Sequence, residues 1–235
     1  MRWEEPPSKS QIDNLYSSLR SIRNNSVVSV LSSKKYQIKN FSLFKIGNED
    51  NSYFFFPEVS IWGNSLPFLF CKIARKLITP IPKLTSNFKV IDGLVAQAKS
   101  NKQYSNHTFT YAHLMIPHSP YVLDSAGSLR KQDETPDKMK YLSQLKYSQK
   151  IMVYLISTIT SYDPNSVIII QGDHGYRGLT NPVDKRNEEK TIFNIIYLGG
   201  EQLPKNTLPY LNNPINNFRI VFNKLFGMKL KLLKN

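Results

Sequence analysis

Hydrophobic patterns in the second half of the chain predict several β-strands. Residues 108–116 read TFTYAHLMI, a β-branched and aromatic run that ends at Pro117, and they predict a strand that stops at a turn. Residues 167–170 form a short apolar run ended by Gly172, which is typical of a strand covered on both faces. Residues 191–198 predict one more strand.

Helical spacing lies between and after these strands. Apolar residues recur at intervals of three and four between residues 139 and 159, which predicts one face of a long helix. Asn213 as N-cap, Pro214 as the first helical residue and Gly227 just past the end frame another helix. Its expected buried residues are Phe218, Val221, Phe222 and Leu225. Strand, helix and strand in that order favour a right-handed crossover, and hence an α/β fold with a largely parallel central sheet flanked by helices.

The first half of the chain gives fewer signals. Asn25 is placed to cap a short helix through residues 27–31, and residues 36–44 alternate as expected for a strand. Prolines interrupt residues 45–105, where the pattern predicts one helix over residues 69–77.

Length and composition exclude several classes of protein. A chain of 235 residues with 40% hydrophobic and 20% charged residues is large enough for a packed α/β domain and too apolar to be disordered. Residues 54–71 are the most apolar window, but Pro57, Glu58 and Pro67 interrupt it, so we expect no membrane span. No apolar signal segment follows Met1. The single cysteine, Cys71, is expected to be buried as a small apolar residue.

The net charge of +14 raises the question of nucleic-acid binding. The excess is diffuse, because residues 1–100 and 101–235 each carry +7. One basic cluster, without acidic residues, runs from Arg219 to Lys234. No DNA- or RNA-binding motif accompanies it, so we expect a mostly solvated basic surface and no nucleic-acid partner.

The candidate chemistry follows the strand over residues 167–170. There the chain reads Gln171-Gly172-Asp173-His174-Gly175, and ligand sites in α/β sheets lie beyond the carboxyl ends of strands. A carboxylate and an imidazole between glycines that allow a sharp turn can reach one divalent cation. The alternative is that Asp173 caps a turn and His174 hydrogen-bonds locally. Three of the four histidines lie at or just beyond predicted strand ends, which favours the metal: His113, His118 and His174.

Several segments, in order, resemble the sulfatase-like branch of the alkaline phosphatase superfamily. The segments are YAHLMIPHSPYVLD, YLSQLKYSQKIM, SVIIIQGDHGYRG, TIFNIIYL and PINNFRIVFNKLFG, with a weaker likeness in NNSVVSVLSSKKYQIKNFSLF. The resemblance implies an alkaline phosphatase-like α/β fold and metal-dependent hydrolysis or transfer of phosphate or sulfate esters. The implied cofactor is a divalent ion: Mn, Zn, Mg or Ca. Relatives of this kind are often tethered to the bacterial inner membrane with the domain on its outer face.

The resemblance also assigns roles to residues. Asp173 and His174 match the aspartate–histidine pair that binds the metal, and His118 matches a histidine that contacts the ester oxyanion or leaving group. Arg177 is positioned to hold an anionic oxygen, or else to form a surface salt bridge. We expect His113 to be a core or supporting histidine and His107 a loop residue.

One part of the family pattern has no counterpart. Its first metal ligands and its nucleophile precede the region that aligns with Asn24, where this chain offers Glu4, Glu5, Ser8 and Ser10 without a strand or activating turn. Thr85 and Ser86 come too late along the chain. We therefore identify no nucleophile and expect residues 1–23 to be an extension and 24–235 a partial domain, truncated or split, that needs a complementing N-terminal polypeptide. The alternative is a non-catalytic domain that binds anionic lipid headgroups or polysaccharide.

Overall fold

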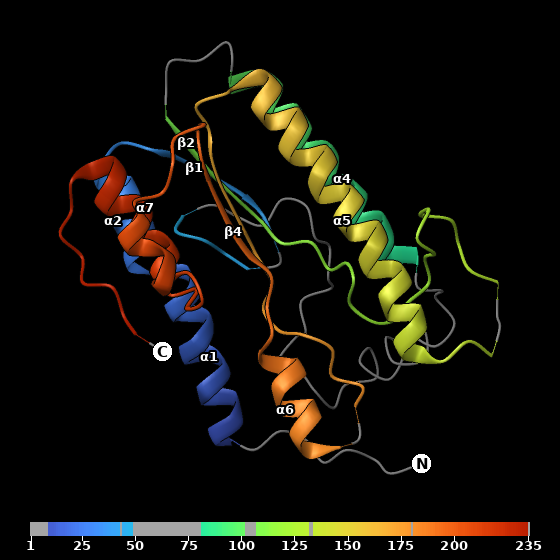
Figure 1. Ribbon diagram of the computed structural model, residues 1–235. Coiled ribbons are helices and arrows are strands. Elements are labelled where there is room, and N and C mark those ends of the chain that lie inside the picture. Colours follow the sequence, from blue (N-terminus) through green and yellow to red (C-terminus); the bar gives the residue numbers. More distant parts are fainter. Residues whose placement is uncertain are drawn as a thin grey trace. The chain divides into compact units, whose positions relative to one another are not determined.

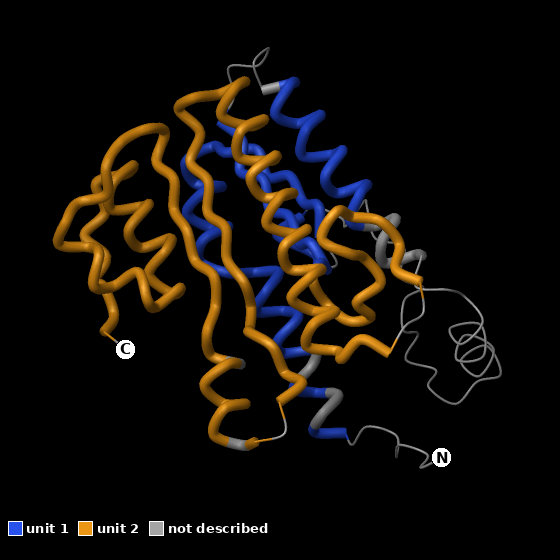
Figure 2. Tube along the Cα trace, turned by 45° about the vertical axis from the view of Figure 1, so that its right-hand side comes forward, with its two compact units in different colours: residues 1–116 blue, residues 117–235 orange. Residues whose placement is uncertain are grey.

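The computed structural model describes residues 9–42, 44–48, 81–101, 107–131, 134–179 and 181–234 (Figure 1). The chain divides into two compact units, residues 1–116 and residues 117–235 (Figure 2). The expected helix over residues 69–77, the apolar window over 54–71 and Cys71 lie outside the described residues. Among the helices that are described, none is long and apolar enough to span a membrane.

Unit 1 is built from helices around a parallel pair of strands. Its elements are α1 Lys9–Arg23, α2 Ser26–Ser33, β1 Gln37–Phe41, α4 Ile81–Asn101 and β2 Thr108–Ala112. The predicted cap of α2 is confirmed, because the side chain of Asn25 accepts a hydrogen bond from the backbone N–H of Val28 at 2.9 Å. Helix α4 was not predicted, since Pro82 counts as a breaker in a sequence pattern. In the first helical turn a proline is tolerated, because the N–H that it lacks would have no partner there.

The sheet of unit 1 is parallel, as expected, with the register running from Gln37 opposite Thr108 to Phe41 opposite Ala112. Strand β2 is shorter than the predicted 108–116. After it, the backbone N–H of Met115 donates to the side chain of Asn87 on α4 at 2.7 Å instead of to a neighbouring strand. Phe41 of β1 and Val90 of α4 are buried together.

Unit 2 carries a pair of antiparallel strands. Its elements are α5 Asp137–Tyr162, β3 Val167–Gln171, α6 Pro182–Lys190, β4 Asn194–Leu198, the 3-10 helix η1 Lys205–Tyr210 and α7 Asn216–Phe226. The structure confirms the helix predicted over residues 139–159, which is α5. It also confirms the strands predicted over 167–170 and 191–198, which are β3 and β4. Strand β3 pairs with β4 from Val167 opposite Leu198 to Gln171 opposite Asn194.

This antiparallel pairing corrects the expectation of a largely parallel sheet, which holds for β1 and β2 only. Helix α6 explains the difference. Its sequence PVDKRNEEK has no apolar face with which to cover a sheet, so it cannot serve as a crossover helix. In Figure 1 it lies ahead of the start of β4, and the chain returns from it along β4, antiparallel to β3.

Helix α7 ends as predicted and begins later than predicted. Gly227 caps its C-terminus with a positive φ of 62°. Asn213 lies in a turn ahead of the helix, where its side chain accepts from the N–H of Ile215, and is not the N-cap. Val221 and Phe222 are buried as expected, but the expectation for Leu225 is wrong, because it lies in the last turn and is 47% exposed.

Candidate functional site

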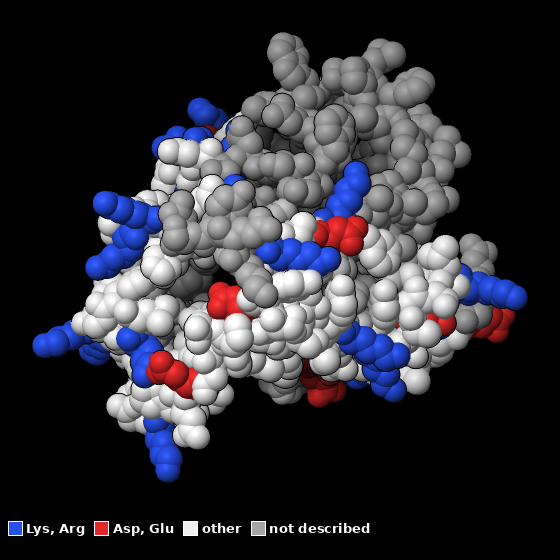
Figure 3. All heavy atoms as spheres, turned by 90° about the horizontal axis from the view of Figure 1, so that it is seen from above, with Lys and Arg blue, Asp and Glu red and all other residues white. Residues whose placement is uncertain are grey.

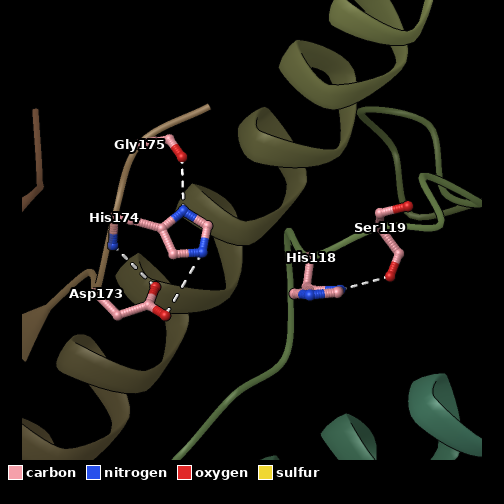
Figure 4. A network of polar contacts seen from close by, with 5 residues as sticks. All are labelled: His118, Ser119, Asp173, His174 and Gly175. Carbon is pink, nitrogen blue, oxygen red and sulfur yellow. Dashed lines mark hydrogen bonds and ion pairs between the residues drawn. The ribbon is translucent and has the colours of Figure 1, made fainter. Parts of the chain in front are cut away.

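Asp173 and His174 form a compact turn directly after β3 (Figure 4). The backbone N–H of His174 donates to Oδ1 of Asp173 at 3.0 Å. The imidazole Nδ1 of His174 lies 2.6 Å from the backbone oxygen of Gly175, and its Nε2 lies 3.6 Å from Oδ2 of Asp173. The Asp173 side chain is 80% exposed and that of His174 is 25% exposed, so the pair opens to solvent through the carboxylate.

These contacts determine which atoms are available to a ligand. A carbonyl oxygen can only accept, so Nδ1 of His174 carries the hydrogen, and in the neutral ring Nε2 has the lone pair. This is how metal-binding histidines are usually held, with the second nitrogen tied to a backbone carbonyl. The expected local hydrogen bonds are present, but they use Nδ1 and Oδ1 and leave Nε2 and Oδ2 facing each other.

The pair fits a divalent cation as two of its ligands. Two ligands of a tetrahedral ion, each bonded at about 2.1 Å, are separated by about 3.4 Å, which is close to the observed 3.6 Å. An imidazole and a carboxylate together suit Zn²⁺ or Mn²⁺ better than Ca²⁺, which prefers oxygen ligands alone. Within the described residues, no group of three or more His, Cys, Asp or Glu side chains could hold a metal ion, so this part of the chain supplies two donors.

The two glycines beside the pair have different roles. A Cβ on Gly175 would overlap the carbonyl oxygen of Glu188 and lie 2.8 Å from that of Thr191, so the turn packs directly on the backbone at the C-terminal end of α6. A Cβ on Gly172 would come no closer than 3.7 Å to the backbone of Phe193. Neither residue has a positive φ. Close approach at Gly175, rather than a sharp bend at both glycines, therefore positions His174.

A group of side-chain amides around the buried Asn217 supports the turn from behind. Asn217, at the start of α7, is 1% exposed and donates to Oε1 of Gln171 at 3.0 Å and to Oδ1 of Asn194 at 2.7 Å. Gln171 is the last residue of β3, two positions before Asp173. Sequence reasoning missed this group, although the pair Asn216-Asn217 inside the apolar segment PINNFRIVF is a polar signal.

His118 lies in the same unit, near the Asp173–His174 turn but apart from it. Its Nδ1 lies 2.5 Å from the backbone oxygen of Ser119, and the side chain is exposed. Figure 4 shows no hydrogen bond or ion pair between His118 and the Asp173–His174 pair.

The other candidate residues are placed as follows. Arg177 is exposed, three residues after His174, and no ion pair joins it to an acid within the described residues, so the salt-bridge alternative has no partner there. His113 is half-buried in unit 1 with its ring edge-on to Phe44 at 5.8 Å, as expected of a core histidine. His107 precedes β2 in a loop and stacks on Tyr36.

The sequence identified no nucleophile, and the structure describes only part of the residues considered for it and for the first metal ligands. Glu4, Glu5 and Ser8 lie outside the described residues, and so do the side chains of Thr85 and Ser86, whose backbone belongs to α4. Ser10 lies on α1 with an exposed side chain.

A carboxylate and an imidazole adjacent to each other can bind a divalent cation, and ligand sites of α/β sheets lie beyond the carboxyl ends of strands. Residues 8–217 match the sulfatase family, and the chain belongs to this family. The family belongs to the alkaline phosphatase superfamily, and its members typically use a divalent metal to hydrolyse sulfate or phosphate esters. Comparison with curated proteins and with solved structures finds no match.

Proposed function

We propose that this protein is a metal-dependent domain for hydrolysis or transfer of phosphate or sulfate esters, with Asp173 and His174 holding one side of the cation. The observation that carries the proposal is the orientation of the His174 ring. Its Nδ1 is tied to Gly175, and its Nε2 faces the exposed carboxylate of Asp173 at 3.6 Å. The family match supplies the reaction class.

When bound, the cation would neutralise the ester oxygens and lower the pKa of an attacking hydroxyl. The protein's own groups would hold the ester. The Nδ1 of His118 is engaged by the backbone oxygen of Ser119, so Nε2 is the ring nitrogen left to face an anionic oxygen of the ester. The exposed guanidinium of Arg177 can donate two parallel N–H bonds to the anionic oxygens of the ester.

The remaining metal ligands and the nucleophile come, in this proposal, from outside the described residues. They are supplied either by other residues of this chain or by a complementing N-terminal polypeptide. Two ligands alone bind a divalent ion weakly, so the source of the others decides whether the chain is active by itself.

The first experiment measures Mn²⁺ affinity of the full chain, alone and with a polypeptide that carries the N-terminal part of a sulfatase domain. We expect His174→Ala and Asp173→Asn each to weaken Mn²⁺ binding at least tenfold. His107→Ala is the matched control, because it removes a loop histidine of unit 1 and should leave the affinity unchanged. Hydrolysis of an aryl phosphate and an aryl sulfate under the same conditions identifies the ester. Absence of Mn²⁺ and Zn²⁺ binding, with and without the second polypeptide, contradicts the proposal.

The C-terminal basic segment supports the alternative of a binding domain for anionic surfaces. Residues 228–234 run along α7, where Asn223 exchanges two hydrogen bonds with the backbone of Leu230, at 2.9 and 2.7 Å. Lys229, Lys231 and Lys234 are exposed on this segment. Elsewhere, Figure 3 shows basic side chains spread over the face that it draws, with acidic side chains among them.

This alternative predicts that the chain sediments with vesicles of anionic lipid, or binds an anionic polysaccharide, and does not sediment with neutral vesicles. Replacing the three exposed lysines with glutamine should abolish such binding and leave Mn²⁺ affinity unchanged. Equal sedimentation of the variant and the native chain would exclude this role for the segment.

A further inference from the structure

One face of α5 contacts both loops that carry the candidate histidines. Tyr141, Gln144 and Ser148 are spaced by three and four residues, so they share a face of the helix. Gln144 is 3% exposed and Ser148 is 6% exposed. A glutamine so deeply buried is held by specific partners, because an unpaired buried amide is costly.

Gln144 bridges the two ends of the His118 loop, residues 118–123. Its Nε2 donates to the backbone oxygen of His118 at 3.2 Å, and its Oε1 accepts from the backbone N–H of Leu123 at 3.0 Å. Leu123 is 1% exposed, so this second bond is buried. One side chain therefore attaches both ends of the loop to α5.

Tyr141, one helical turn earlier, contacts both loops. Its ring lies edge-on to Tyr121, at 5.6 Å between centroids, and Tyr121 belongs to the His118 loop. On its other side it packs on Tyr176, at 4.8 Å, which is two residues after His174 and 6% exposed. Burial raises the pKa of Tyr141 above the ordinary tyrosine value, with a further contribution from Glu188.

We propose that Tyr141 and Gln144 are positioning residues that place His118 and His174 relative to each other through α5. Gln144 holds only the His118 loop in position, whereas Tyr141 contacts both that loop and the His174 turn and so couples their positions. The two histidines lie on separate loops without a direct bond, so their separation depends on the common support. A displacement of about 1 Å in such a site is enough to reduce catalysis by about 100-fold. The inference rests on the proposed function of the site.

Hydrogen exchange of the metal-free full chain, followed by mass spectrometry, tests the coupling. Gln144→Leu should increase exchange in residues 118–123 at least tenfold and leave residues 172–178 unchanged. Tyr141→Ala should increase exchange in both segments. Tyr141→Phe should show the native exchange rate in both, because it keeps the ring. Ser148→Ala is the control, since its hydroxyl bonds to Leu145 in its own helix at 2.8 Å, and it should change neither segment.

Two results would overturn the inference. One is unchanged exchange at residues 118–123 in Gln144→Leu, and the other is an effect of Tyr141→Ala confined to a single loop. Should Gln144→Leu fail to fold, Gln144→Glu replaces it. The glutamate keeps an acceptor for the N–H of Leu123 and loses the donor to His118, so exchange should rise in the His118 loop only.

Binding measurements separate positioning from general stability. With Mn²⁺ present, Gln144→Glu should weaken binding of inorganic phosphate at least fivefold at unchanged Mn²⁺ affinity, because it disturbs His118 and not His174. Tyr141→Ala should weaken the binding of both phosphate and Mn²⁺, and Tyr141→Phe should bind both as the native chain does. A native chain that binds neither Mn²⁺ nor phosphate contradicts the proposed function, whereas the exchange pattern of the metal-free chain decides the coupling independently.

Discussion

The side chains of Asn194 and Asn217 hydrogen-bond each other in both directions, with Nδ2–Oδ1 distances of 2.9 and 2.7 Å. Asn194 begins β4 and Asn217 lies in the first turn of α7. Since Asn217 also donates to Gln171 at the end of β3, three elements are joined directly behind the turn that carries Asp173. The position of the candidate metal ligands thus depends on the hydrogen bonds that the buried Asn217 makes to both strands.

Asn217→Ala is therefore expected to destabilise unit 2. The substitution removes both bonds that the half-buried amide of Asn194 makes to Asn217, whereas the exposed oxygen of Gln171 can bond to water instead. We expect a cost of about 1–2 kcal/mol in the free energy of unfolding. Urea denaturation measures the change. Asn212→Ala, at an exposed neighbouring position, is the control and should change the midpoint little. Equal urea midpoints for Asn217→Ala and Asn212→Ala would show that the side-chain amide of Asn217 adds no stability.

Gly175→Ala should disturb the His174 turn, whereas Gly172→Ala should be tolerated. The added methyl group at position 175 meets the carbonyl oxygen of Glu188, and backbone cannot move aside cheaply. At position 172 the nearest atom is 3.7 Å away. We expect Gly175→Ala to lower the free energy of unfolding by about 1–3 kcal/mol and to weaken Mn²⁺ binding. Similar values for the two alanine variants would contradict the close packing of this turn.

Asp124 should make the stability of unit 2 depend on acid pH. Backbone N–H groups of Ser128 and Ala126 donate to its carboxylate at 2.9 and 2.8 Å and lower its pKa below the ordinary 3.8. A lowered folded-state pKa stabilises the fold above the unfolded value, and this contribution is lost as pH falls through the folded value.

Thermal unfolding of Asp124→Asn across the acid range tests this dependence. At neutral pH we expect a lower Tm than for the native chain, and the difference should shrink as pH falls below 3.8 and through the lower folded-state pKa. Asp163→Asn is the control, since that carboxylate accepts one such bond, from Asn165 at 3.1 Å, and it should show a smaller difference. A Tm difference that persists unchanged in acid argues against the charge as its cause.

Asn223→Ala should release the C-terminal segment from α7. The native side chain makes both a donor and an acceptor bond to the backbone of Leu230, and Asn216 makes the equivalent pair with Leu233, at 2.8 and 2.9 Å. We expect trypsin to cleave after Lys229 and Lys231 several-fold faster in the variant. Trypsin should cleave the control Asn212→Ala at the native rate. Unchanged cleavage in Asn223→Ala would mean that the bonds of Asn223 are not what protects the segment.

Several local features follow from the sequence because they depend on neighbouring residues. The cap at Asn25, the end of α7 at Gly227 and the long helix α5 arise from hydrogen bonds and periodicity within a few positions. The placement of Asp173 and His174 directly after a strand is local for the same reason. The succession of segments also identifies the family, since it needs only their order along the chain.

The tertiary structure alone determined how these pieces are oriented and supported. The sequence of β3 is compatible with either strand direction, and its antiparallel pairing depends on α6, which is too polar to cover a sheet. Gln144 bonds to His118 across 26 positions and Asn217 to Gln171 across 46. Local patterns carry no information about such partners, because a side-chain amide has the same sequence signature whether it faces water or a buried carbonyl. The sequence by itself thus determined which residues could bind a metal ion, and the packing decided which of their atoms are available to do so.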